Sequence, residues 1–200
     1  MNMDNLDKPI TSALDELGDR IRALRTERGM TLQELSQASQ VSVAMLSHIE
    51  LSRSAPSIKV LDRIRSALNV SFSSFFDDVE DSPKSASTPV VTRSDQRPIL
   101  RFDATGLVKE LLSPSRGARM EMMMLILEPG GYSGVEPWRR IGEKCGIVLE
   151  GSFELQLGSQ IYSMSENDAF QFDGAIPHSF RNTRDGQSKI MWIILSEEHG

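Results

Sequence analysis

Cysteine is nearly absent from this chain, which holds Cys145 and no second thiol among its 200 residues. An intrachain disulfide is therefore impossible, and this composition is typical of proteins that remain in the reducing cytosol. Long apolar runs are missing too, because no stretch approaches the roughly 20 apolar residues that span a bilayer. The first ten residues, MNMDNLDKPI, lack the basic start and apolar core of a signal peptide. We therefore expect a cytoplasmic protein without a membrane partner.

An excess of positive charge is also lacking, since the formal net charge is −6. Residues 1–76 carry nine basic and nine acidic side chains, residues 77–95 carry two and five, and residues 96–200 carry eleven and fourteen. This balance argues against a protein that coats nucleic acid without selectivity. The neutral first part can still bind DNA selectively if its basic residues gather on one side.

Two short segments of helical periodicity follow one another between residues 31 and 50. Thr31 and Glu34 form a capping-box pattern at the start of the first segment, and Ser42 is a typical N-cap for the second. Only a tight turn fits between them, which predicts a helix-turn-helix whose second helix enters the DNA major groove. The apolar positions that define the period are Leu32, Leu35, Ala38, Val43, Leu46 and Ile49.

These segments resemble the phage-repressor/Cro-like (Xre) helix-turn-helix family. The residues that carry the likeness are Gln33, Glu34, Leu35, Val41, Ser42, Leu46, Ser47, Ile49, Glu50 and the pair Pro56-Ser57. Ser36 and Gln40 differ from the family pattern, which usually has Ala and Gly there. If Gln40 adopts a positive φ, the cost is roughly 1 kcal/mol.

The resemblance implies a set of DNA contacts, at Gln33, Ser42, Val43, Ala44, Ser47 and His48. Ser42 is expected to act as a cap and phosphate donor, while Val43 and Ala44 suit thymine methyl groups. Arg53 follows the second helix, where a phosphate contact and a plain surface role are both open. His48 has the same two interpretations.

The remaining pattern divides the chain into three parts: a first domain over residues 1–76, a linker over 77–95 and a second domain over 96–200. Five helices are predicted for the first, which would be lambda-repressor-like. Phe72, Phe75 and Phe76 are expected in a short fifth helix that closes the core. The linker is rich in Ser, Pro, Thr and acid. The first helix carries Arg20, Arg22, Arg25 and Arg28. These arginines are expected on a solvated face, and the alternative is that one or two of them contact DNA phosphate.

Short strands separated by Gly, Pro, Asn and Asp dominate the second domain, which predicts a sandwich or barrel. The run Arg119–Leu127 fits a strand or a helix by periodicity, and Pro129-Gly130-Gly131 after it favours a strand. The other predicted strands are Gly146–Leu149, Ser152–Leu157, Gln160–Met164, Ala169–Phe172, Ser179–Arg181 and Lys189–Leu195.

This second part resembles the small-barrel cupin family, a double-stranded β-helix. The likeness is carried by Pro129–Gly131, Ile147–Leu157 and Asn167–Asn182, where His178 and Asn182 match the family's second motif. Three positions of that motif are replaced, by Asn167, Asp173 and Ala175. The whole chain therefore resembles an Xre-type regulator with a C-terminal cupin domain.

Metal-binding cupins hold their ion with His-x-His, a Glu and a later His. The resemblance places these positions at Trp138, Arg140, Lys144 and His178, so one ligand remains of four. Arg and Lys are cations at neutral pH and do not replace imidazole or carboxylate around a divalent metal. If the motif were aligned one residue earlier, Glu143 would take the position of the Glu ligand. Glu143 and His178 together would still be too few ligands for a metal ion. We predict neither a metal nor another cofactor.

The same four residues suggest a cationic pocket with an aromatic wall. An Arg fork binds carboxylate or phosphate in a bidentate manner, which favours a small anionic or amino-acid-like effector. The alternative is that these side chains point to solvent or bind the chain's own Glu136 and Glu143. Cys145 is expected to pack as a small apolar residue, with redox sensing the minor interpretation.

The function predicted from these features is sequence-specific transcriptional regulation. A homodimer would bind a pseudo-palindromic double-stranded operator, and the cupin domain would sense an effector. Two alternatives stay open. The cupin domain serves dimerisation alone, or it is an isomerase or dioxygenase. The enzymatic alternative is disfavoured because no nucleophile–base pair replaces the metal ligands, so we predict no catalytic residue.

Overall fold

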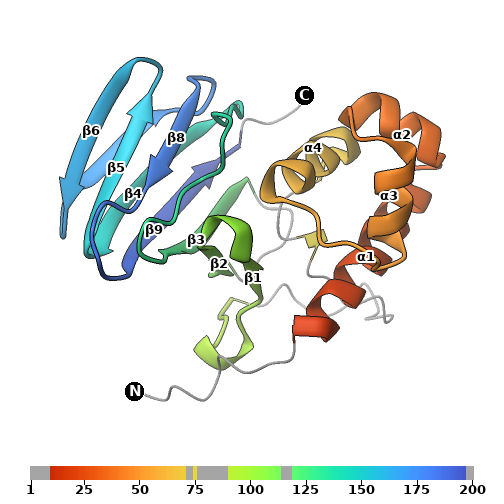
Figure 1. Ribbon diagram of the computed structural model, residues 1–200, viewed down its shortest axis with the longest axis horizontal. Coiled ribbons are helices and arrows are strands. Elements are labelled where there is room, and N and C mark those ends of the chain that lie inside the picture. The colour runs from red at the N-terminus through yellow and green to blue at the C-terminus, as the bar shows by residue number, and fades with distance from the viewer. Residues whose placement is uncertain (1–9, 71–73, 76–89, 114–118, 197–200) are drawn as a thin grey trace. The chain divides into compact units, whose positions relative to one another are not determined.

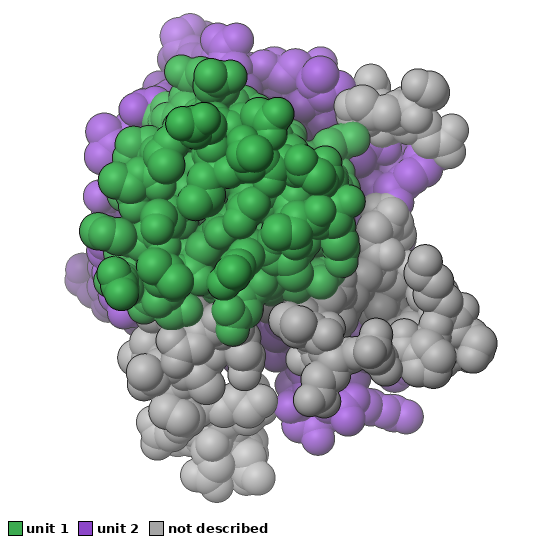
Figure 2. Space-filling view, turned by 90° about the vertical axis from the view of Figure 1, so that its right-hand side faces the viewer, with its two compact units in different colours: residues 1–89 green, residues 90–200 purple. Residues whose placement is uncertain are grey.

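The protein is described by a computed structural model that covers residues 10–70, 74–75, 90–113 and 119–196 (Figure 1). The chain forms two compact units, residues 1–89 and residues 90–200, shown in two colours in Figure 2. Within the described residues four α-helices precede nine strands, so the predicted order of an α-helical part and a β part is confirmed. None of the described helices is both long and apolar enough to cross a membrane.

The first unit consists of α1 (Ile10–Glu27), α2 (Leu32–Ser39), α3 (Val43–Glu50) and α4 (Ile58–Leu68). The predicted N-caps Thr31 and Ser42 are confirmed, because the side chain of each accepts a backbone N–H of the following helix. Ser57 caps α4 in the same way. Side chains from α1 to α4 form one apolar core, which includes Leu17, Ile21, Leu24, Leu35, Leu46, Ile49, Leu61, Ile64 and Leu68.

The predicted fifth helix lies mostly outside the described residues. Ser74 and Phe75 adopt a short 3-10 conformation, and Phe75 is buried as predicted. Phe72 and Phe76, the other two aromatic residues of this prediction, are not among the described residues, and neither is 77–89 of the predicted linker.

Gly18 allows α1 to approach the end of α3 closely. A Cβ atom at this position would lie 2.5 Å from the carbonyl oxygen of Ile49 and 2.8 Å from Oγ of Ser52. Non-bonded carbon and oxygen atoms do not approach to 2.5 Å, so a larger residue would push the two helices apart. The absence of a side chain at Gly18 therefore sets the position of α3 on α1.

The second unit is built from two antiparallel sheets, with strand orders β1-β2-β3-β9-β4-β7 and β6-β5-β8. A 3-10 turn at Ser94–Gln96 precedes the strands and another, Asp103–Thr105, joins the first two. The strands are β1 (Ile99–Phe102), β2 (Leu107–Leu111), β3 (Met120–Leu127), β4 (Glu143–Glu150), β5 (Ser152–Leu157), β6 (Gln160–Ser165), β7 (Ala169–Asp173), β8 (His178–Arg181) and β9 (Ser188–Leu195).

Aromatic rings from both sheets meet in the core of this unit, which shows that the sheets face each other. The ring centroids of Phe170 and Trp192, from the six-stranded sheet, are 4.9 Å apart. From the three-stranded sheet, Phe180 lies 5.4 Å and Phe153 lies 6.2 Å from Trp192. Buried and more exposed residues alternate along β2, β3, β8 and β9, as expected for strands with one face in the core.

The predicted barrel is confirmed, with two corrections. Arg119–Leu127 forms β3 from Met120 onward, so the strand interpretation was right. Gly146–Leu149 is only the middle of β4, which begins at Glu143, and β1 and β2 were not predicted as individual strands. The predicted motif residue Asn182 is buried, and its Nδ2 donates to the carbonyl oxygens of Leu127 and Gly186 at 3.1 Å and 2.7 Å.

Candidate DNA interface and candidate effector site

A tight turn joins α2 to α3, as the sequence predicted. Gln40 has φ 56° and ψ 30°, the left-handed conformation in which a residue other than glycine is strained. Its Nε2 donates to the carbonyl oxygen of Gln37 at 2.7 Å, which closes α2. Ser42 then accepts from the backbone N–H of Met45 at 3.3 Å and begins α3.

The capping box at the start of α2 is complete. The backbone N–H of Thr31 donates to Oε2 of Glu34 at 2.7 Å, and the N–H of Glu34 donates to Oγ1 of Thr31 at 3.2 Å. The hydrogen bonds that the carboxylate accepts, first from the backbone and then from the hydroxyl of Thr31, lower the pKa of Glu34. Gln33 lies in this first turn with its side chain exposed.

One face of α3 is buried and the other is open. Leu46, Ile49 and Glu50 pack inward. The exposed residues lie at its N-terminal end and along one side, and are Ser42, Val43, Ala44, Met45 and His48, with Ser47 half-buried. The predicted DNA-contacting residues of α3 therefore share one accessible surface. Arg53 is also exposed, just after the helix.

An ion pair fixes the end of α3 to α1. Nε and Nη2 of Arg25 donate to the two carboxylate oxygens of Glu50 at 2.7 Å and 2.8 Å. Nη1 of Arg25 also donates to the carbonyl oxygen of Met30 at 2.8 Å. The hydrogen bond to Glu50 raises the pKa of Arg25, against an opposing effect of burial and with a further contribution from the charge of Glu50.

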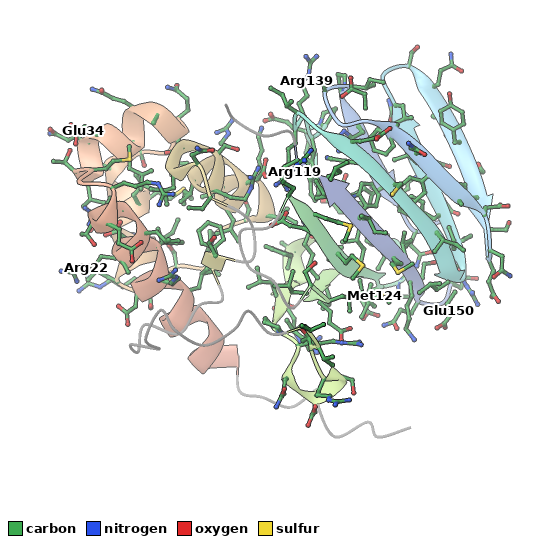
Figure 3. The ribbon with its side chains drawn as sticks, turned by 180° about the vertical axis from the view of Figure 1, so that it is seen from behind. Arg22, Glu34, Arg119, Met124, Arg139 and Glu150 are labelled. Atoms are coloured by element: carbon green, nitrogen blue, oxygen red, sulfur yellow. The ribbon has the colours of Figure 1, made fainter. Side chains whose placement is uncertain are left out.

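The expectation of a solvated arginine face on α1 is thus wrong for part of the helix. Arg25 binds Glu50 of α3. Nε of Arg20 donates to the carbonyl oxygen of Ser74 at 2.7 Å, and Arg28 donates to the carbonyl oxygen of Asn69 at 3.2 Å. Arg22 is exposed (Figure 3). Sequence periodicity located the helix but not these contacts, because their partners lie up to 54 residues away.

Two more residues were missed by the sequence interpretation. Met45 is 42% exposed beside Val43, which is 40% exposed. Ser39 rather than Ala38 packs inward from α2, and its Oγ donates to the carbonyl oxygen of Leu35 at 2.6 Å. A serine that satisfies its hydroxyl on its own helix can be buried, and the apolar pattern did not reveal this.

Basic side chains also lie on α4, near its capped start. Lys59 and Arg63 are one helical turn apart, with Arg63 exposed. The pKa of Lys59 is lowered, first by desolvation and then by the positive charge of Arg63.

In the β unit, a row of side chains crosses the inner face of the six-stranded sheet. Glu121 on β3 and Lys144 on β4 are both paired with Ile194 on β9, so all three point to the same side. Glu121 and Lys144 are 1% and 2% exposed. Two opposite charges thus lie inside the barrel, on either side of an isoleucine.

The predicted residues Lys144 and His178 contact each other directly. Nζ of Lys144 lies 2.5 Å from Nε2 of His178, and Nδ1 of His178 lies 2.7 Å from the carbonyl oxygen of Ile176. A carbonyl oxygen only accepts, so Nδ1 carries the ring hydrogen. In this tautomer Nε2 accepts a hydrogen bond from Nζ of Lys144.

Arg140 is directed to a different partner. Its Nη1 donates to Oε2 of Glu121 at 3.0 Å, and its Nη2 donates to Oγ of Ser196 at 3.1 Å. The sequence offered Glu136 and Glu143 as partners within the chain. Glu121, to which Arg140 donates, was not named by the sequence interpretation, and Glu143 accepts from Nε2 of Gln171 at 2.6 Å.

Trp138 joins the cluster through its ring. Its centroid lies 6.4 Å from that of His178 and 5.3 Å from that of Phe180, both edge-to-face. Nζ of Lys109, a buried residue of β2 that the sequence interpretation missed, lies 4.5 Å from the Trp138 ring centroid. The period-2 pattern of β2 could have identified Lys109 as an inward-facing cation.

These residues do not fit a cupin metal ion. The lysine ammonium occupies the Nε2 side of His178, the side from which a metal would be ligated. The described residues contain no group of three or more His, Cys, Asp or Glu side chains with a suitable arrangement. Lys144 and Arg140 carry the wrong charge for the other ligand positions.

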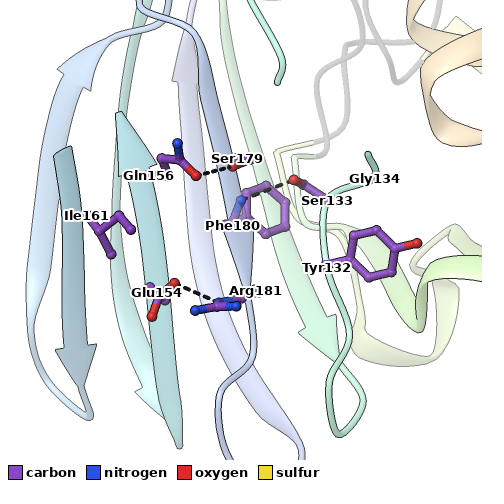
Figure 4. Close-up of a pocket in the computed structure, with 9 residues that line it drawn as sticks. All are labelled: Tyr132, Ser133, Gly134, Glu154, Gln156, Ile161, Ser179, Phe180 and Arg181. Atoms are coloured by element: carbon purple, nitrogen blue, oxygen red, sulfur yellow. Dashed lines mark hydrogen bonds and ion pairs between the residues drawn. The ribbon is translucent and has the colours of Figure 1, made fainter. Parts of the chain in front are cut away.

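A shallow pocket of about 230 Å³ lies on the outer side of the three-stranded sheet (Figure 4). An ion pair between Arg181 and Glu154, at 2.6 Å, forms part of its wall, and the hydrogen bond to Glu154 raises the pKa of Arg181. None of the four predicted effector residues lines this pocket. Cys145 is half-buried on β4.

Two family profiles match the chain. The helix-turn-helix profile matches residues 21–75, and the cupin domain profile matches residues 123–194. The fold and the exposed face of α3 therefore define a two-domain DNA-binding protein. The chain belongs to the Xre-type helix-turn-helix transcriptional regulators that carry a C-terminal cupin domain.

Similar proteins match almost the whole chain. It is 27% identical over 177 residues to the HTH-type transcriptional regulator PuuR of Escherichia coli, covering 87% of this chain and 91% of that protein. It is 26% identical to the regulator SutR of the same organism, covering 83% and 86%. An HTH_3 family transcriptional regulator from Vibrio cholerae has a similar fold, with a TM-score of 0.73 at 22% identity, covering 94% of this chain and 99% of that one.

Proposed function

We propose that the protein is a sequence-specific regulator that binds double-stranded operator DNA through α3 and responds to a small effector in its cupin domain. The observation that carries the DNA-binding proposal is the division of α3 into two faces. Its buried face is fixed by Arg25, Glu50 and Gly18. Its open face presents the residues that the family uses for contact.

The proposed DNA contacts are those predicted from the sequence, and the exposure of Ser42, Val43, Ala44 and His48 supports them. Gln33, in the first turn of α2, and Arg53, after α3, anchor phosphates on either side of the groove. Ser42 caps α3 and donates its hydroxyl hydrogen to phosphate, because its oxygen already accepts from Met45. The remaining contacts are made by the α3 residues Val43, Ala44, Ser47 and His48.

A two-fold dimer would place two copies of α3 about 34 Å apart along one side of the duplex. Sedimentation of the full chain and the spacing of half-sites in selected DNA test this arrangement. A dimer with half-sites one helical turn apart supports it. A monomer that binds a single half-site with full affinity contradicts it.

The effector is proposed to bind at Trp138, Arg140, Lys144 and His178. What supports this site is the burial of two cations, Lys109 and Lys144, in one barrel, with Nζ of Lys109 over the ring of Trp138. An incoming carboxylate or phosphate would compete with Glu121 for Arg140 and accept from Lys144 in place of His178. The effector is therefore expected to be anionic, and its binding to rearrange the contacts of this cluster.

A structural role for the same cluster is the second candidate. The specific observation that favours it is that Arg140 and Lys144 already have partners within the chain, Glu121 and His178. In that case the cupin domain contributes stability and dimerisation only. Neither candidate includes catalysis, and we propose that the protein is not an enzyme.

Calorimetric titration and thermal shift with a panel of anionic metabolites and amino acids separate the two candidates. A ligand that binds the native state raises the melting temperature. Binding should be lost in Arg140→Ala and kept in Arg139→Ala, since Arg139 is an exposed neighbour of the same charge (Figure 3). Undiminished binding by Arg140→Ala contradicts the effector site, as does a panel without any binder.

Metal content tests the absence of a metal in the same site. Protein purified without chelator should contain no stoichiometric iron, manganese or zinc, because Lys144 occupies the Nε2 side of His178. One equivalent of metal that disappears in His178→Ala contradicts this proposal.

A further inference from the structure

The exposed face of α3 is unusually apolar at its beginning. Val43, Ala44 and Met45 follow one another and are all exposed, although Leu46 and Ile49 of the same helix are fully buried. None of these three residues belongs to the buried core of the described helical unit. Exposed apolar side chains in succession have a physical cost in water unless another surface covers them.

Side chains that read base edges by paired hydrogen bonds are missing from this helix. The sequence of α3 is VAMLSHIE, without Arg, Lys, Asn or Gln. Arg and Lys pair with the acceptors of guanine, and Asn and Gln pair with adenine. On α3, only Ser47 and His48 are polar and at least partly exposed.

The apolar feature of the major groove is the C5-methyl group of thymine, which contacts Ala and other apolar side chains. We propose that Val43, Ala44 and Met45 form a methyl-reading surface, and that the protein selects operators by the positions of thymine methyl groups. This inference rests on the proposed DNA-binding function and specifies how its site discriminates between sequences.

The orientation of the methyl-reading surface is set by the packing behind it. Arg25 holds Glu50 at the C-terminal end of α3, and Gly18 brings α1 within contact of Ile49. Both contacts hold the helix at its C-terminal end, while Val43, Ala44 and Met45 of its first turn are exposed. Met45 has the longest and most adaptable of the three side chains, which suits it to reach a methyl group away from the helix axis.

The test begins with the full chain and a library of random DNA duplexes. Enriched duplexes are then resynthesised with single deoxyuridines in place of thymidines, which removes only the C5-methyl group and leaves base pairing unchanged. At the thymines that face α3, each substitution should weaken binding about fourfold, from the free energy of burying one methyl-sized group. Substitutions elsewhere in the duplex should leave the affinity unchanged.

A variant comparison assigns the effect to the methyl-reading surface. For each thymine that faces α3, the affinity for the thymine duplex is divided by the affinity for the matching uracil duplex. In Met45→Ala this ratio should fall close to one at a subset of these thymines. Leu51→Ala is the matched control, because Leu51 is exposed and apolar at the opposite end of α3 and should leave the ratio unchanged. Circular dichroism is used to check that both variants remain folded.

The outcomes separate this inference from the function on which it rests. If no sequence is enriched, the proposed sequence-specific binding is wrong and the inference falls with it. If a motif is enriched but uracil changes affinity less than twofold everywhere, DNA binding stands and methyl reading is overturned. A uracil effect that is equal in wild type, Met45→Ala and Val43→Ala also overturns it.

Discussion

Glu50→Ala is expected to lower the stability of the helical unit and to leave that of the β unit unchanged. Both carboxylate oxygens of Glu50 accept from Arg25, and the two side chains are only 5% and 12% exposed. Removal of one partner of such a pair leaves a buried charge without compensation and costs about 3–5 kcal/mol. Since a whole domain is stable by only about 5–15 kcal/mol, much of the helical unit's stability should be lost.

The two units can be followed separately in one sample. Both tryptophans of the chain, Trp138 and Trp192, belong to the β unit, so tryptophan fluorescence reports on that unit alone. Far-ultraviolet circular dichroism is dominated by the helical unit. In a urea titration, Glu50→Ala should lower the dichroism midpoint by about 3 M if the slope is about 1 kcal/mol/M, and leave the fluorescence midpoint in place.

A control variant distinguishes the ion pair from a general charge effect. Glu27→Ala removes the same charge from an exposed position on α1 and should change either midpoint very little. If Glu50→Ala and Glu27→Ala unfold at the same urea concentration, the pair does not hold α3 in place and the reasoning is refuted.

Three further changes have expected outcomes. Gln40→Gly should stabilise the helical unit by about 1 kcal/mol, because it removes left-handed strain, and an unchanged dichroism midpoint would contradict this. The pKa of Glu34 is depressed in the folded protein, so its contribution to stability is fully present above pH 4.5 and is lost as the pH falls through that depressed pKa. Wild type should therefore lose more stability on acidification than Glu34→Ala. Asn182→Ala should destabilise the β unit by at least about 2 kcal/mol in the fluorescence transition, since buried carbonyls lose their donor, and an unaltered transition would argue against this role.

Local signals in the sequence predicted much of the helical unit. Thr31 and Ser42 were identified as caps because a cap needs only a side chain and the turn that follows it. The possible strain at Gln40 was noted because the family pattern usually has Gly at this turn position, and its φ of 56° meets the stated condition. Ser152–Leu157 was likewise predicted with the bounds that β5 has in the structure.

Contacts between distant residues could not be predicted in the same way. Nothing near Arg25 in the sequence indicates that Glu50 is its partner, and the pair only becomes visible once α1 packs on α3. The same limit applies to Arg140, whose partner Glu121 lies on a strand 19 residues earlier. Family resemblance brought Lys144 and His178 to one site, but the direct contact between them required the register of β4 and β8.

The most direct test of whether the open face of α3 recognises a DNA sequence is a comparison of two affinities. The affinity of the full chain for a selected duplex is compared with its affinity for a scrambled duplex at the same salt concentration. Wild type should prefer the selected duplex by about a thousandfold or more. Ala44→Glu places a carboxylate on that face and should abolish the preference while the circular dichroism stays unchanged. Equal affinity of wild type for both duplexes, or a folded Ala44→Glu protein that binds as tightly as wild type, would contradict the proposed role of this helix.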